Sequence, residues 1–117
     1  MIEGFDSEQA MSFFDNNKDF YNELLVLYYN DILKRKKELN KSMVTKDVKS
    51  FVLHIHSIKS SSETVGMNYL YKKSKKLEML VQSENFESIA KDFDLFMLYI
   101  DKMLNNLKIY LMNYDLI

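Results

Sequence analysis

Residues 45–66 read TKDVKSFVLHIHSIKSSSETVG, and this stretch shows the pattern that decides the fold. Apolar or small side chains recur at intervals of three and four residues, which is the spacing of one face of an α-helix. These positions are Val48, Phe51, Val52, Ile55, Ile58, Ser62 and Val65. Thr45 is a favourable N-cap residue, and Gly66 stands where glycine commonly ends a helix. The stretch therefore predicts an amphipathic helix that starts near Thr45 and ends near Gly66.

The same spacing continues on both sides of this stretch. Residues 17–42 carry Phe20, Leu24, Leu27, Tyr28, Ile32 and Leu39. After the glycine, one face carries Leu70, Ser74, Leu77 and Val81, and the polar run 82–85 interrupts the pattern. A last segment over about 86–113 is expected to point inward Ile89, Phe93, Phe96, Ile100, Leu104, Leu107 and Leu111. A short first helix is expected to start at Asp6 or Ser7, because Asp6 and Gln9 resemble a capping box.

The composition favours helices throughout the chain. The 117 residues include two glycines and no proline, so the turns of a multi-stranded sheet have little sequence support. The length fits one domain. We therefore predict a single all-α domain over residues 1–117, an antiparallel up-and-down four-helix bundle with a short N-terminal capping helix.

Charge and cysteine content narrow the classes of function. The formal net charge is −1, whereas a protein that binds nucleic-acid phosphates normally carries a basic excess. No apolar run reaches the roughly 18 residues of a membrane span, and the first residues lack signal-peptide features. The absence of cysteine excludes disulfides and thiolate chemistry. We expect a cytoplasmic protein with no nucleic-acid partner and no membrane partner.

Two histidines lie two residues apart in the predicted helix. A His-x-His pair can converge on a metal ion from a strand, but on a helix the two rings point apart. Because the chain has no third histidine and no cysteine, we expect no metal site. His54 is interpreted as a passive residue at the edge of the core. The basic run at 34–37 is interpreted as the solvated back of its helix.

His56 differs from His54 in the residues around it. On a helical wheel it lies at the edge between the buried face and water, and Lys59 lies one turn further along. The ammonium of Lys59 can there lie over the outer ring nitrogen and attract an anion bound to it. Ser60 and Ser61 keep the adjoining surface low, and Leu53 is expected to be exposed beside it. This pattern favours a histidine presented to a protein partner rather than an enzyme pocket.

The helix after Gly66 must run antiparallel to the helix that carries His56. Lys75 and Glu78 lie three residues apart near the edge of its buried face. Glu78 is therefore a candidate to accept a hydrogen bond from the inner nitrogen of His56. That bond would fix the tautomer and leave Nε2 free as a nucleophile.

These residues resemble the signature of the histidine-containing phosphotransfer (HPt) domain family. The family pattern is His-x-Leu/Ile-Lys-Gly followed by small residues, then a further glycine, and Leu-Glu in the next helix. The matching residues are His56, Ile58, Lys59, Ser61, Ser62, Gly66, Leu77 and Glu78. Ser60 departs from the pattern, because the family has glycine directly after the lysine. The hydroxymethyl group that serine adds at this position is expected to affect the rate of phosphoryl transfer and the choice of partner.

The resemblance implies a carrier in a phosphorelay of two-component signalling rather than an independent enzyme. His56 would accept a phosphoryl group on Nε2 from a receiver-domain aspartate or a kinase and pass it to another receiver aspartate. Lys59 would stabilise the phosphoryl charge, and Glu78 would orient His56. The partners implied are response-regulator receiver domains, a hybrid histidine kinase, or both. Mg²⁺ would be held by the receiver, so the resemblance implies no cofactor on this chain. The partner-docking residues would be Leu53, Ser60, Ser61, Glu63 and Lys75.

Two alternative hypotheses stay open. A binding-only relative would dock on receiver or kinase domains without carrying phosphate. An unrelated helical adaptor would use Leu53 and the surface of its helix to bind a partner helix. Acid-labile, base-stable phosphorylation at His56 separates the carrier from the binding-only protein.

Overall fold

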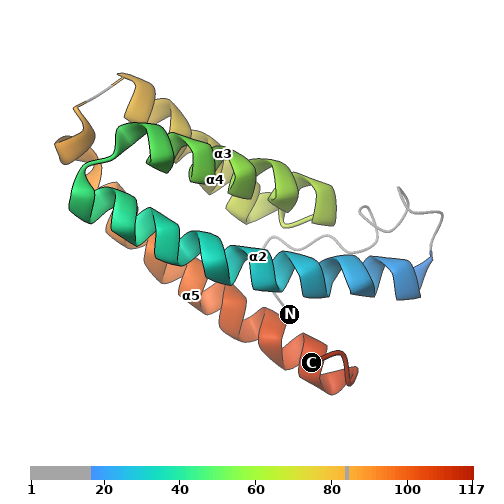
Figure 1. The fold of residues 1–117 in the computed structure, drawn as a ribbon. Helices are drawn as coiled ribbons and strands as arrows, with labels where there is room; N and C mark the ends of the chain where they lie inside the picture. The colour runs from blue at the N-terminus through green and yellow to red at the C-terminus, as the bar shows by residue number, and fades with distance from the viewer. Residues whose placement is uncertain (1–16, 84) are drawn as a thin grey trace.

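The computed structural model describes residues 17–83 and 85–117, and each long helix in it runs antiparallel to the next (Figure 1). In chain order the elements are α2 (Lys18–Thr45), α3 (Val48–Val65), α4 (Asn68–Ser83), the short 3₁₀ helix η1 (Phe86–Ile89) and α5 (Ala90–Asn113). The expected capping helix near Asp6 and Ser7 lies outside the described residues.

The four long helices close into a bundle. Helix α2 packs against α3 and α5, and α4 packs against the same two helices. In Figure 1, α3 and α4 form a hairpin, and α2 extends past the turn of that hairpin. This arrangement confirms the predicted all-α, up-and-down four-helix bundle.

The junction between α2 and α3 differs from the prediction. Thr45 is the last residue of α2, and its hydroxyl donates to the carbonyl of Lys41 at 2.8 Å. Lys46 adopts a left-handed conformation with φ 55°, and the side chain of Asp47 accepts from the backbone N–H of Ser50 at 3.0 Å. The expectation that Thr45 caps the next helix is therefore wrong, because the chain reverses at Lys46 and the carboxylate of Asp47 takes the capping position.

The turn between α3 and α4 confirms the role predicted for Gly66. Its φ of 83° is in the left-handed region, where a side chain is costly. The N–H of Gly66 donates to Glu63 O at 3.3 Å, and the N–H of Met67 donates to Ser62 O at 2.8 Å. These bonds satisfy the last carbonyls of α3 and send α4 back along it.

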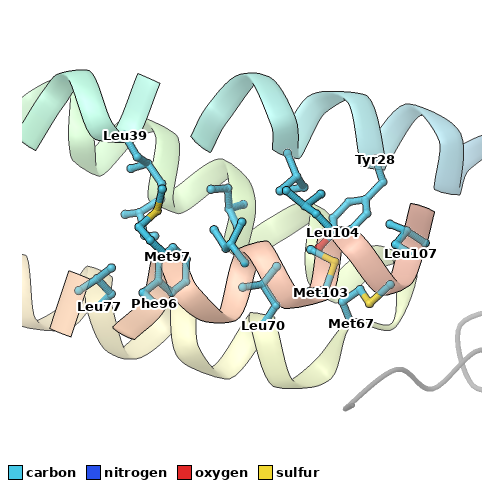
Figure 2. Close-up of a cluster of buried hydrophobic side chains, with 14 of the residues drawn as sticks. Tyr28, Leu39, Met67, Leu70, Leu77, Phe96, Met97, Met103, Leu104 and Leu107 are labelled. Atoms are coloured by element: carbon cyan, nitrogen blue, oxygen red, sulfur yellow. The ribbon is translucent and has the colours of Figure 1, made fainter. Parts of the chain in front are cut away.

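The core contains side chains from all four long helices (Figure 2). The predicted inward residues of α4 and α5 are buried, as are those of α3 except Val48 and Val52. Among the labelled side chains, Tyr28 and Leu39 of α2 join Leu70 of α4 and Phe96 of α5 in one cluster. The periodicity of these three later helices thus predicted their buried faces.

Over its first turns, α2 buries a different face from the one predicted. Phe20 and Leu27 are 45% and 65% exposed, whereas Tyr21 and Leu25 are buried. The hydroxyl of Tyr21 donates to the carbonyl of Val65 at 2.6 Å, at the end of α3. Because apolar residues occur on several sides of this helix, the tyrosine that also finds a hydrogen-bond acceptor lies inward.

A buried polar pair explains the serine at a core position of α3. The hydroxyl groups of Tyr28 and Ser62 lie 2.7 Å apart, and the side chains are 4% and 0% exposed. Each hydroxyl thereby provides the other with a hydrogen-bond partner within the apolar core. The pair links α2 to α3 along the half of α3 that follows His56.

Candidate functional site

His56 of α3 and Glu78 of α4 meet at the edge of the bundle. The Nδ1 atom of His56 lies 2.8 Å from Oε2 of Glu78. The imidazole is 61% exposed, whereas the carboxylate side chain is 11% exposed. The predicted contact between the two helices is thus present, with the ring facing solvent and its partner set into the surface.

The ionisation of Glu78 determines the tautomer of His56. Burial raises the pKa of Glu78, but the hydrogen bonds from Lys59 and His56 outweigh it and hold the pKa below its ordinary value. A carboxylate only accepts hydrogen bonds, so Nδ1 of His56 must carry the proton. In the neutral ring, the lone pair is therefore on Nε2, the nitrogen on the far side of the ring from Glu78.

Lys59 completes a three-residue cluster, although in a different position from the one expected. Its Nζ donates to Oε1 of Glu78 at 2.6 Å, so the two carboxylate oxygens of Glu78 are divided between Lys59 and His56. The same hydrogen bond raises the pKa of Lys59. The ammonium is therefore anchored to the carboxylate that also contacts Nδ1, the inner ring nitrogen of His56.

The geometry follows from the register of the α3–α4 hairpin. His56 precedes the turn at Gly66 by ten residues, and Glu78 follows it by twelve. At about 1.5 Å per helical residue, the two positions lie at similar heights above the turn. Lys59 is one turn nearer to Gly66 on the same side of α3, which brings its long side chain to the same carboxylate.

The predicted docking residues do not all share one face. Leu53 is 64% exposed, and Ser60, Glu63 and Lys75 are also exposed. Ser61 is half-buried and lies at a hollow between α2 and α3. Four of the five residues are thus exposed, and Ser61 belongs to the α2 side of the helix.

Lys75 has a neighbour that the sequence did not suggest. Its Nζ lies 6.0 Å from the centre of the Tyr71 ring, one turn earlier in α4. This arrangement places a cation and an aromatic surface on the helix that carries Glu78.

The second histidine points to the other side of α3, as expected for a His-x-His pair on a helix. Nδ1 of His54 lies 3.0 Å from Nη1 of Arg35, whose Nε donates to Asp31 at 2.9 Å. Arg35 belongs to the basic run interpreted as a solvated back, and Lys36 of that run pairs with Asp101 of α5. That interpretation is therefore wrong for these two residues. The i, i+4 spacing of Asp31 and Arg35 was the available signal for an ordered arginine.

The fold defines the chain as a helical bundle of the HPt type. The HPt domain of a Shewanella Hpt sensor hybrid histidine kinase superposes with a TM-score of 0.83, over 94% of this chain and 95% of that one, at 11% identity. In sequence, 83 residues (71% of this chain) are 32% identical to the phosphorelay intermediate protein rdeA of Dictyostelium discoideum. The chain spans about a third of that curated relative, since the match covers 33% of it. No family model matches the sequence.

The chain thus has the fold of an HPt domain and sequence similarity to a phosphorelay intermediate protein. Within residues 17–83 and 85–117, no group of three or more His, Cys, Asp or Glu side chains is placed to hold a metal ion. In the same part of the chain, no helix is both long enough and apolar enough to cross a membrane.

Proposed function

We propose that this chain is a phosphorelay carrier, which accepts a phosphoryl group on Nε2 of His56 and passes it on. The observation that carries the proposal is the exposed imidazole whose Nδ1 proton is donated to Glu78 at 2.8 Å. That hydrogen bond fixes the lone pair on Nε2, where a partner can reach it. The similarity to a phosphorelay intermediate and to an HPt domain supports the same role.

The chemistry needs no base on this chain. Nε2 attacks phosphorus of an aspartyl phosphate on a receiver domain, or of the phosphoryl group held by a kinase. The N–P bond forms while the bond to the leaving oxygen breaks, and the electron pair leaves with that oxygen. The ring keeps its Nδ1 proton and becomes positively charged, so the carboxylate of Glu78 stabilises the product and the transition state that leads to it. Transfer to a second receiver aspartate is the reverse of this step.

Lys59 serves two groups in this proposal. Its ammonium has three N–H donors, of which one is directed to Glu78. We assign another of these N–H donors to an oxygen of the phosphoryl group once that group is bound to His56, because Lys59 and His56 lie on the same side of α3. Lys59 then contributes to holding Glu78 ionised before transfer and to neutralising phosphoryl charge after it.

The partner surface proposed here lies on α3 and α4 around His56. Leu53, Ser60 and Glu63 are exposed on α3, and Lys75 is exposed on α4. An acidic receiver site would be attracted by Lys75 and would find an apolar contact at Leu53. The receiver-domain and kinase partners, the single-domain assignment and the cytoplasmic location stay predictions.

The test is incubation of the chain with a panel of phosphorylated receiver domains. We expect at least one receiver to lose phosphate while His56 gains it as an acid-labile, base-stable adduct. The His56→Gln variant is expected to gain none, and His54→Gln is the matched control that should behave as the wild type. Binding to a receiver without any transfer to His56 would instead support the binding-only alternative.

A further inference from the structure

The two histidines of α3 contact groups of opposite hydrogen-bonding character. Nδ1 of His56 lies 2.8 Å from a carboxylate oxygen of Glu78 in α4. Nδ1 of His54 lies 3.0 Å from the guanidinium Nη1 of Arg35 in α2. The same ring atom therefore faces an acceptor in one histidine and a donor in the other.

This difference fixes opposite tautomers. A guanidinium only donates hydrogen bonds and stays protonated, so Nδ1 of His54 must accept with its lone pair. The proton of the neutral His54 ring is then on Nε2. His54 has no free lone pair on either nitrogen, whereas His56 has one on Nε2.

Arg35 is held in place for this contact. Its Nε donates to Asp31 at 2.9 Å, and its side chain is 24% exposed. The guanidinium thus spans from Asp31, on its own helix, to the ring on α3. Burial and the charge of Arg35 both lower the pKa of His54, which favours the neutral form of the ring.

We propose that Arg35 is a specificity-determining residue, which holds His54 as the Nε2–H tautomer and so confines phosphoryl acceptance to His56. The confinement to one acceptor rests on the proposed carrier function. The tautomer assignment itself does not, because it follows from the contacts of the unphosphorylated chain.

The first experiment measures the ring tautomers by ¹⁵N NMR of the full chain, above the pH range in which histidines titrate. We expect the proton on Nε2 of His54 and on Nδ1 of His56. In Arg35→Met, His54 should lose its fixed tautomer while His56 keeps its own. Lys37→Met is the matched control, since it removes one charge from the same basic run and should change neither ring. A Nδ1 proton on His54 in the wild type, or an unchanged His54 in Arg35→Met, would overturn the proposal.

The second experiment uses phosphoramidate, a small donor that needs no docking surface. The P–N bond of the donor breaks as a ring nitrogen bonds to phosphorus, and ammonia leaves with the proton it takes from solvent. In a His56→Gln background, Arg35→Met should raise labelling of His54 by about tenfold, the equivalent of one charge-assisted hydrogen bond, whereas Lys37→Met should not. No increase would refute the role of Arg35 in selectivity.

The two experiments separate the possible failures. A wild-type chain that shows the expected tautomers but takes no label at His56 would count against the carrier function and leave the tautomer assignment standing. If Arg35→Met does not fold, as judged by circular dichroism, Asp31→Asn is the second variant. It removes the anchor of Arg35 and should shift the His54 tautomer in the same direction to a smaller extent. An unchanged tautomer there would count against the inference.

Discussion

Replacing Glu78 with glutamine tests how much the contact to His56 contributes to phosphoryl acceptance. The variant keeps the shape of the side chain but loses the negative charge that faces Nδ1 at 2.8 Å. A hydrogen bond to a charged group contributes about 1.5–3 kcal/mol. Because the imidazole is 61% exposed, we take the lower end, about 1.5 kcal/mol. If that amount is lost from the transition state, the rate falls about tenfold.

The assay is the initial rate of phosphohistidine formation from phosphoramidate, followed by ³¹P NMR. This donor removes any contribution of partner docking from the measurement. Glu23→Gln is the matched control, because it removes the same charge from an exposed site of α2, outside the proposed partner surface. We expect the control to react within about twofold of the wild type, well inside the change of roughly 1.4 kcal/mol that a tenfold effect requires.

The fold should survive this substitution. Losing the charge at two hydrogen bonds costs about 1–3 kcal/mol, less than the roughly 5–15 kcal/mol of a typical domain. Circular dichroism of both variants establishes this before the rates are compared. A folded Glu78→Gln variant that reacts as fast as Glu23→Gln would refute the argument that the carboxylate stabilises the charged ring.

Three further predictions concern stability. Tyr28→Phe leaves the buried hydroxyl of Ser62 without its partner and should lower the free energy of unfolding in urea by about 1–3 kcal/mol. The double variant Tyr28→Phe, Ser62→Ala should lose less than the sum of the two single variants, and additive losses would contradict the pairing. Gly66→Ala should cost about 1–2 kcal/mol because φ is 83°, and an unchanged thermal midpoint would contradict a left-handed turn. The pKa of Glu78 is below its ordinary value of 4.5, so its stabilising contribution is present above that value and is lost as pH falls through the lower, folded-state pKa. The difference in thermal midpoint between the wild type and Glu78→Gln should therefore be constant near neutral pH and shrink in acid; a difference that grows in acid would contradict this sign.

The sequence predicted the features that depend on one helix or one turn. Apolar spacing defined the buried faces of α4 and α5, and a single glycine defined the reversal at Gly66. That reversal also brought His56 and Glu78 to similar heights, so their contact could be anticipated from distances along the chain. The apolar pattern within each helix and the register of the α3–α4 hairpin were therefore sufficient to predict these features.

The features that the sequence did not predict involve choices between neighbours of similar chemistry. Helix α2 has apolar residues on several sides, and hydrogen bonds to α3 decide that Tyr21 rather than Phe20 lies inward. Lys59 was expected to attract an anion bound to His56, but in the unphosphorylated chain its ammonium donates to the carboxylate of Glu78. His54, the second partner of Arg35, lies on another helix 19 positions along the chain, so sequence spacing gave no signal of this contact.

The most direct test of the central claim is the position of the N–P bond after transfer from a phosphorylated receiver domain. Digestion and mass spectrometry identify the labelled histidine, and NMR of the intact phosphorylated chain identifies the ring nitrogen. We predict one acid-labile, base-stable phosphoryl group on Nε2 of His56, absent from His56→Gln. Label that persists in His56→Gln, or an N–P bond at Nδ1 of His56, would contradict it.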